Sequence, residues 1–357
     1  MALIKNYAIW NNKGGVGKST ITYHISTRYA ELNPEVDVLV IDLCPQANLS
    51  MMLLGGGGNS GSNKVMEYST MEEPQTVVGY ISEVLSGGPG ARRPDNNKYA
   101  TQVSAVNPNL PSNLYLLCGD GLLEVIAPAI IDRANQRPIN PKEQPWVWVH
   151  RIIRNFIEDF AAEREDKDVT VFIDTNPAFG IYTELAITAA DELICPVNAD
   201  DSSRVAAYAM MMLIHGANPP HPVYGGWTFA SLAAQNGLQV PPVKLIIGNR
   251  FTQYDGAARA FSAMSDATTE ELYNSYQTNP DYFTTPTRNI SNLDDFRNEY
   301  AVILRDFNTT GVVTTHIGSL LSSMHSGTYP VHGENVTLDN RRISDCQEAI
   351  DNVIGKL

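Results

Sequence analysis

Residues 13–20 read Lys-Gly-Gly-Val-Gly-Lys-Ser-Thr, a glycine-rich run that closes with a lysine and two hydroxyl side chains. Small residues allow backbone N–H groups to turn inward and surround phosphate oxygens, and a following helix points its positive end at the same anion. In such a loop the lysine reaches the β- and γ-phosphates, and the first hydroxyl ligates magnesium. The run therefore predicts a site for a nucleoside triphosphate with Mg²⁺, with ATP favoured, formed by Gly14, Gly15, Val16, Gly17, Lys18, Ser19 and Thr20.

The strict phosphate-loop pattern G-x-x-x-x-G-K-[ST] is met only in its second half, because its first glycine falls on Asn12. The alternative interpretation is a glycine-rich turn with an unrelated lysine. The context favours the phosphate loop, since an apolar run at 3–10 precedes it, a helical stretch over 18–32 follows, and a strand that ends in an acid lies downstream.

That acid is Asp174, which follows the apolar run Val-Thr-Val-Phe-Ile. An aspartate at the carboxyl end of a strand, beside a phosphate loop, can hold magnesium through water. The alternative is an ordinary helix cap or turn residue.

The elements that must position these residues can be predicted from hydrophobic patterns. Short apolar runs predict buried strands over 3–10, 36–43, 113–118, 169–174, 192–197, 243–248 and 311–315. Helices are predicted over 18–32, 75–85, 146–163, 201–215, 256–275 and 341–355. The order strand, loop, helix, strand at the start of the chain is typical of an α/β fold with a mostly parallel sheet flanked by helices.

Segments with the composition of loops separate these elements. Residues 55–63 (GGGGNSGSN) are predicted to be flexible, and residues 87–113, rich in Pro, Asn and Gly, to form a long loop. Because no internal repeat and no clean linker is visible, we interpret the chain as one domain over 1–357, with loop insertions near 55–74, 87–112 and 276–310.

The composition restricts the classes of partner. The 357 residues are 43% hydrophobic and carry a net charge of -14 at pH 7, which allows a large core but gives no general attraction to nucleic acid or anionic lipid. Four scattered cysteines without a C-x-x-C pair fit reduced thiols better than a zinc site. Without a signal peptide or an apolar run of the ~20 residues that span a bilayer, we expect a soluble cytoplasmic protein. In the C-terminal stretch 341–357 the polar side is acidic, which favours docking on the protein's own domain over a membrane-surface helix.

Four segments together resemble the deviant Walker A ATPases of the ParA/MinD type. The loop carries that family's additional lysine, Lys13. Residues 42–50 (DLCPQANLS) are similar to the switch I motif D-x-D-P-Q-G-N, and residues 174–177 (DTNP) to the switch II motif D-T-P-P. Asn249, after the strand VKLIIG, is similar to the family's adenine-contacting asparagine. The Pro-Gln of switch I and the segment lengths favour the ParA branch, which has the P-loop NTPase fold.

The resemblance implies a role for each matched residue. Lys13 would cross a dimer interface to the nucleotide of the other subunit, and Asn249 would bind adenine. The catalytic group would comprise Lys13, Lys18, Asp42 and Asp174. Magnesium would be held by Ser19, Asp42 and Asp174.

As a function, the resemblance implies an ATP-dependent homodimer that partitions or positions DNA or another cargo. Its partners would be a ParB-like or adaptor protein and non-specific DNA, and a membrane would not be among them. Binding to DNA would place the protein on the nucleoid. Basic residues that could contact DNA are few, and in the C-terminal half they are Arg204, Arg250, Arg259, Arg288, Arg297, Arg305, Arg341 and Arg342. The alternative is a metabolic or cofactor-maturation ATPase of the same fold.

Two positions depart from the family pattern. Cys44 stands where the second acid of D-x-D orients the attacking water, and a neutral thiol cannot hold that water as a carboxylate does. Hydrolysis is therefore expected to be slow, unless Asp42 takes over the role. Asn176 replaces the first proline of D-T-P-P, which makes this switch less stiff.

Overall fold

The computed structural model describes residues 4–138, 140, 142–164, 166–198, 200–217, 223–251, 255–305 and 307–357. Its centre is an eight-stranded sheet in the order β3-β4-β2-β5-β1-β6-β7-β8. All neighbouring strands are parallel except the edge pair β3–β4. The strands are β1 Ile4–Ile9, β2 Asp37–Leu43, β3 Ala100–Gln102, β4 Leu114–Leu117, β5 Val169–Thr175, β6 Glu192–Asn198, β7 Val243–Phe251 and β8 Ala301–Arg305. The predicted α/β fold class is confirmed.

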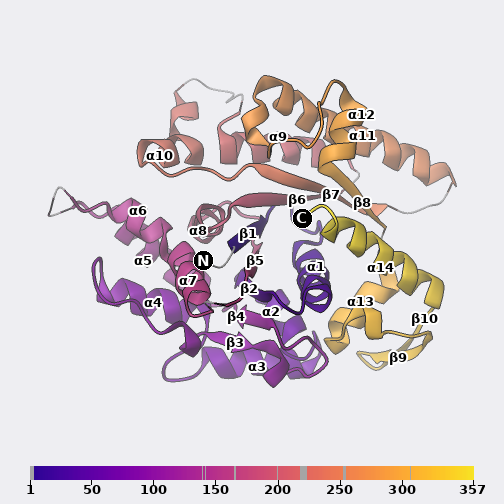
Figure 1. Cartoon of the computed structure of the whole chain (residues 1–357), viewed down its shortest axis with the longest axis horizontal. Coiled ribbons are helices and arrows are strands. Elements are labelled where there is room, and N and C mark those ends of the chain that lie inside the picture. Colours follow the sequence, from indigo (N-terminus) through magenta and orange to yellow (C-terminus); the bar gives the residue numbers. More distant parts are fainter. Residues whose placement is uncertain are drawn as a thin grey trace.

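Helices cover both faces of the sheet (Figure 1). One apolar core packs against α1 Lys18–Leu32, α2 Asn48–Leu53, α3 Asn59–Ser69, α13 Asn308–Ile317 and α14 Asn340–Ile354. The other core packs against α4 Val77–Gly87, α5 Leu123–Ala134, α6 Pro145–His150, α7 Ile152–Ala162, α8 Ile181–Ala189, α9 Asp201–His215, α10 Phe229–Gln235, α11 Asp255–Thr278 and α12 Leu293–Tyr300. A hairpin of β9 Gly327–Val331 and β10 Glu334–Leu338 lies beside α13.

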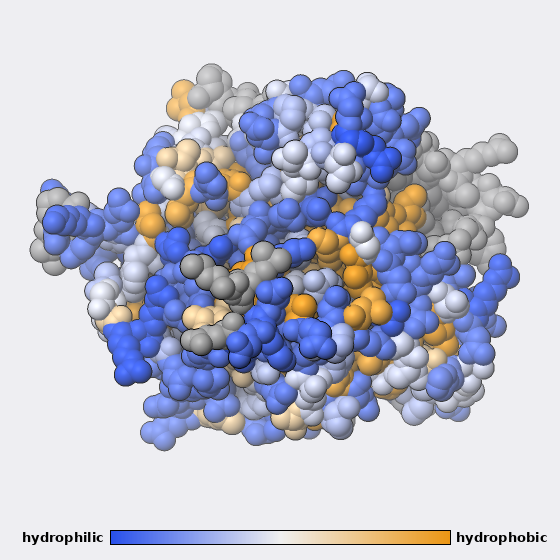
Figure 2. All heavy atoms as spheres, viewed as in Figure 1, coloured by the Kyte–Doolittle hydropathy of each residue, from blue (hydrophilic) through white to orange (hydrophobic). Residues whose placement is uncertain are grey.

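The central strands read as almost unbroken apolar runs because both of their faces are covered. Every residue of β2 and of β5 is buried. Alternate side chains of β1 enter the two cores, with Ala8 on one side and Tyr7 on the other. Figure 2 shows hydrophilic residues over most of one face of the molecule and apolar residues gathered near its middle. This buried sheet fixes the positions of the loops that follow its strands.

The predicted strand over 311–315 is wrong, because these residues lie inside α13. The run Gly-Val-Val-Thr-Thr has the β-branched composition of a strand. In the helix, the hydroxyls of Thr314 and Thr315 donate to the carbonyls of Thr310 and Gly311, one turn earlier, so these side chains are satisfied locally. The last strand of the sheet is β8, which pairs with β7.

Other boundaries differ for local reasons. The flexible segment predicted over 55–63 is wrong from residue 59 onward, where α3 begins. Gly61 allows this helix to approach α2, since a Cβ there would lie 2.0 Å from the carbonyl oxygen of Met51. The helix predicted over 146–163 is divided at Arg151 into α6 and α7. The long loop predicted over 87–113 contains β3 and two short 3₁₀ turns.

The C-terminal helix α14 packs on its own domain, as predicted. Its apolar side is buried, and it contacts α1 and β8. Among the described residues, no helix combines the length and apolarity needed to cross a bilayer. The single-domain interpretation and its loop insertions stay predictions.

Candidate nucleotide site

The candidate site lies where the parallel strands end. Asp42 on β2 is paired in register with Asp174 on β5, and Asp174 is paired with Ile9 on β1. The phosphate loop leaves the end of β1 and enters α1 at Lys18. The topology therefore brings the loop and both aspartates to one edge of the sheet, where open α/β sheets bind ligands.

The backbone of the loop needs its glycines. Gly15 and Gly17 have φ angles of 72° and 84°, in the left-handed region that glycine adopts at little cost. A Cβ on Gly17 would lie 2.4 Å from Nδ2 of Asn249. That amide donates to the carbonyl of Val16 at 2.9 Å. Asn249 therefore contacts the phosphate loop itself, and its predicted contact with adenine stays a prediction.

Lys18 is folded back onto the loop. Its Nζ donates to the carbonyl oxygens of Asn11 at 3.1 Å and of Lys13 at 2.9 Å, and only 6% of the residue is exposed. Burial lowers the pKa of Lys18 to about 8, against the opposing influence of Asp174 and Cys44. A buried ammonium held by neutral carbonyls is poised to bind an anion that enters the loop.

Asp174 joins the loop to the sheet. Its Oδ2 accepts a hydrogen bond from the hydroxyl of Ser19 at 2.6 Å, and its Oδ1 accepts one from Thr22 at 3.4 Å. The carboxyl is fully buried. Its pKa is raised mainly by burial and also by the negative charge of the neighbouring Asp42, and the hydrogen bond from Ser19 and the charge of Lys18 offset only part of this rise. The predicted metal ligands Ser19 and Asp174 are thus adjacent.

Asp42 is held by the segment that follows it. Its Oδ2 accepts hydrogen bonds from the backbone N–H of Ser50 at 2.9 Å and the Ser50 hydroxyl at 2.8 Å, and its Oδ1 accepts one from the N–H of Cys44 at 3.1 Å. Burial raises the pKa of Asp42 in spite of these donors. Gly119 packs directly on this carboxyl, since a Cβ there would lie 2.8 Å from Cγ of Asp42. Two buried carboxyls with raised pKa values are a donor set that fits a divalent cation.

Cys44 is a neutral side chain at this site. It is 5% exposed, and burial, followed by the charges of Asp42 and Asp174, raises the pKa of its thiol to about 12. The thiol is therefore protonated at neutral pH and is at most a weak donor. Nearby, Ala47 has a φ of 50°, so the turn at the start of α2 places a non-glycine residue in the left-handed region.

Lys13 is bound within its own chain. Its Nζ forms an ion pair with both carboxylate oxygens of Asp200 and a hydrogen bond of 3.2 Å with the hydroxyl of Ser203. Asp200 also caps α9 through the N–H of Ser203 at 2.9 Å. Partial burial raises the pKa of the Asp200 carboxyl, but the hydrogen bonds from Lys13, Ser202 and Ser203 outweigh this effect and lower the pKa to about 2. The predicted crossing of Lys13 to another subunit stays a prediction.

Residues outside the predicted set support the predicted ones. Asn11 is fully buried, donates to the carbonyl of Pro196 at 2.7 Å and accepts from the N–H of Lys13. Ser50 holds Asp42, and Asp200 binds Lys13. Ser50 lies inside the switch I segment, so its hydroxyl was a visible signal, whereas Asp200 is 187 positions from Lys13 and gave none.

The arginines considered for DNA are mostly engaged or lie outside the described side chains. Arg204 pairs with Glu271, Arg288 with Glu299 and Arg297 with Asp294. The side chains of Arg250, Arg259 and Arg305 lie outside the described part of the structure. Arg341 and Arg342 are exposed in the first turn of α14.

Comparison with known proteins supports the fold. The family model of an AAA domain matches residues 4–124. An uncharacterized protein of Methanocaldococcus jannaschii is 54% identical over 48 residues, a match that spans 13% of this chain and 18% of that protein. A Cyanothece McdA variant solved as an ATP complex is similar, with a TM-score of 0.59 and 14% identity over 100% of this chain and 97% of that one.

A putative plasmid partition protein of Borrelia burgdorferi B31 bound to AMPPNP is also similar, with a TM-score of 0.53 and 14% identity over 99% of both chains. Identities this low establish the fold and leave the activity to be argued from the site. The family model of an AAA domain therefore matches residues 4–124, and the chain as a whole has the fold of the ParA-like P-loop NTPases.

Proposed function

We propose that this chain is a ParA-like ATPase that binds ATP with Mg²⁺, pairs with a second copy in the ATP state and positions DNA or another cargo. The observation that carries the proposal is the convergence of Lys18, Ser19, Asp42 and Asp174 at the carboxyl edge of the sheet, beside a glycine loop that opens α1. The structural relatives named above contain ATP or AMPPNP, which supports a triphosphate as the ligand.

Phosphate binding follows from the contacts of Lys18. Its ammonium is buried and held by two carbonyl oxygens of the loop. Charged phosphate oxygens are stronger acceptors than carbonyls, so a triphosphate that enters the loop displaces these contacts. The N-terminus of α1 adds its partial positive charge at the same point.

Magnesium suits the carboxyls beneath the loop. Burial raises the pKa of both Asp42 and Asp174, and a bound cation would offset the cost of placing two negative charges there. Ser19, Asp174 and Asp42 would hold the ion, and when bound it would neutralise charge on the β- and γ-phosphate oxygens. Ser50 and the N–H of Cys44 fix the orientation of the Asp42 carboxylate.

Lys13 supplies the proposed switch between monomer and dimer. In the monomer its charge is neutralised by Asp200. In an ATP dimer, two triphosphates face each other, and cations must lie between them because like charges repel. Lys13 would leave its partly exposed ion pair with Asp200 and contact the partner's nucleotide instead. Dimerisation would then depend on the γ-phosphate.

The proposed cargo follows from the resemblance to the ParA-type ATPases. With a net charge of -14 and several arginines already paired, DNA contact would be confined to local sites such as the start of α14. A ParB-like or adaptor protein would stimulate release, because the neutral Cys44 leaves basal hydrolysis slow. Association with the nucleoid would follow from such DNA contact.

A titration with a fluorescent ATP analogue and Mg²⁺ tests the nucleotide site. Lys18→Ala should abolish binding, because it removes the buried ammonium. Lys13→Ala should bind as the wild type does, since Lys13 acts between subunits. Lys64→Ala, which removes a surface ion pair with Glu67 on α3, is the matched control. Equal binding by Lys18→Ala and Lys64→Ala would contradict the proposed site.

A further inference from the structure

The two departures from the switch motifs are neighbours in space. Leu43 is paired in register with Thr175, so the next residues, Cys44 and Asn176, leave adjacent strands side by side. Cys44 stands at the position of the second switch I acid, and Asn176 at that of a switch II proline. One position has thus lost a hydrogen-bonding carboxylate, and its neighbour has gained a hydrogen-bonding amide.

The amide of Asn176 has a fixed orientation. Its Nδ2 donates to the hydroxyl of Tyr182 at 3.2 Å, and that hydroxyl donates to Oε1 of Glu124 at 2.9 Å. The single hydrogen of the Tyr182 hydroxyl is used by Glu124, so the hydroxyl can only accept from Asn176. The nitrogen of the amide therefore faces Tyr182, and Oδ1 faces away from it. Among the described residues, none donates a hydrogen bond to that Oδ1.

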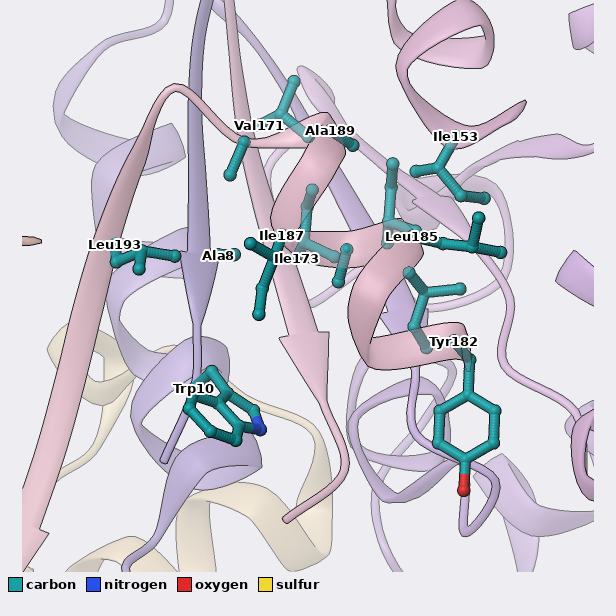
Figure 3. Packing of buried hydrophobic residues seen from close by; sticks show 14 of the residues in the cluster. Ala8, Trp10, Ile153, Val171, Ile173, Tyr182, Leu185, Ile187, Ala189 and Leu193 are labelled. Atoms are coloured by element: carbon teal, nitrogen blue, oxygen red, sulfur yellow. The ribbon is translucent and has the colours of Figure 1, made fainter. Parts of the chain in front are cut away.

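The backbone at Asn176 is held as well. Its carbonyl accepts a hydrogen bond of 3.1 Å from the indole N–H of Trp10, at the end of β1. Figure 3 shows Trp10 and Tyr182 on either side of the end of β5, with the hydroxyl of Tyr182 directed toward the same end of the sheet. The next residue, Pro177, lies 4.0 Å from where a Cβ on Gly14 would stand. Switch II therefore abuts the phosphate loop.

We propose that Asn176, oriented by Tyr182 and Glu124, positions the attacking water through Oδ1 in place of the carboxylate that Cys44 lacks. The inference rests on the proposed ATPase function. The water oxygen would form a bond to the γ-phosphorus while the bond from that phosphorus to the bridging oxygen of ADP breaks. The products are ADP, phosphate and one proton, and the proton leaves through phosphate oxygens to solvent, because an amide accepts a hydrogen bond but takes up no proton.

The chemistry explains why hydrolysis would be slow and still possible. Hydrogen bonds to a neutral carbonyl are roughly half as strong as those to a carboxylate. The amide therefore restores part of the positioning that the family's acid provides. A proline at residue 176 could not do so, since it has no side-chain acceptor.

The test is single-turnover hydrolysis by the full chain, with ATP affinity measured in parallel. Tyr182→Phe removes the hydroxyl and keeps the buried ring, so the amide loses its fixed orientation. We expect the rate to fall about tenfold or more while ATP affinity stays within about twofold, as for the loss of one positioning group. Asn176→Ala should lower the rate at least as much. Tyr99→Phe is the matched control, because it removes a comparable hydroxyl-to-carboxylate hydrogen bond, to Glu83 on α4. This variant should keep the wild-type rate.

Rescue separates positioning from a structural role. Cys44→Asp restores the carboxylate, so Tyr182→Phe should cost little in that background. A rate that is unchanged in Tyr182→Phe, or a loss that Cys44→Asp does not rescue, would overturn the inference and leave the proposed function standing. ATP binding without any turnover in the wild type would do the same. Absence of ATP binding by the wild type would overturn both.

Discussion

At the scale of single residues, Cys44 sets the expected rate of hydrolysis. Its thiol is buried and protonated at neutral pH, so it cannot hold water as an acid does. Cys44→Asp should raise basal turnover on the order of tenfold, because phosphoryl transfer depends on positioning and charge stabilisation. Asp42→Ala should abolish turnover. A steady-state phosphate-release assay that finds equal rates for Cys44→Asp and the wild type would show that the water is positioned independently of residue 44.

The carboxyl of Asp174 predicts a pH dependence of stability. Burial raises its pKa above the ordinary value of 3.8, so above that pH the folded state binds more protons than the unfolded state. The free energy of unfolding without nucleotide should therefore fall as the pH rises from about 4 toward neutrality, and Asp174→Asn should reduce that fall by at least ~1 kcal/mol.

Urea unfolding at several pH values measures this slope. Asp132→Asn, at an exposed position on α5, is the control and should keep the wild-type slope. If the wild type instead became more stable relative to Asp174→Asn as the pH rises over this window, the pKa of Asp174 could not be raised. In Asp174→Asn, Mg²⁺ and ATP should no longer add stability, because the proposed metal ligand is missing.

At the scale of elements, the junction between β4 and α5 is built to support switch I. The N–H of Gly119 donates to the hydroxyl of Ser50 at 2.8 Å, and its α-carbon lies against the carboxyl of Asp42. Gly119→Ala should destabilise the fold by about 1–3 kcal/mol and lower turnover, because a Cβ has no room there. Gly121→Ala is a close control, since the nearest atom to its Cβ would be 3.7 Å away. Equal melting temperatures and rates for both variants would disprove this packing argument.

The strands that carry the site could be predicted from sequence, because parallel strands with two covered faces appear as unbroken apolar runs. β1, β2, β4, β5, β6 and β7 all begin and end within a few residues of their predicted limits. β8 and α13 could not be predicted, since the β-branched run at 311–315 has stronger strand composition than the true strand at 301–305.

The same contrast holds for the site. Lys18, Ser19 and Asp174 were predictable because each lies in a short motif next to a strand end. The partners Asp200 and Tyr182 were not, because their contacts with Lys13 and Asn176 depend on how separate strands and helices pack. Tertiary pairings of this kind leave no periodic signal in the chain.

At the scale of the whole molecule, the negative net charge weakens any attraction to DNA as the proposed cargo. The chain carries -14 at pH 7, so attraction to DNA at long range is unfavourable. If DNA is bound, binding should require ATP, because two copies double the number of contacts, and it should weaken steeply with salt. A gel-shift assay at low salt can measure this, and the removal of Arg341 and Arg342 tests the start of α14. No shift in any nucleotide state would exclude the nucleoid as the cargo surface.

The proposed dimer forms only with ATP, so the molar mass of the protein in solution should depend on the nucleotide. Light scattering should report about 39.2 kDa with ADP and about twice that mass with ATP and Mg²⁺. Lys13→Ala should bind ATP and stay a monomer. Asp200→Asn, which keeps an oxygen to cap α9 but releases Lys13, should dimerise at a lower ATP concentration. The same mass with ATP and ADP, or normal dimerisation of Lys13→Ala, would rule out an ATP-dependent dimer held by Lys13.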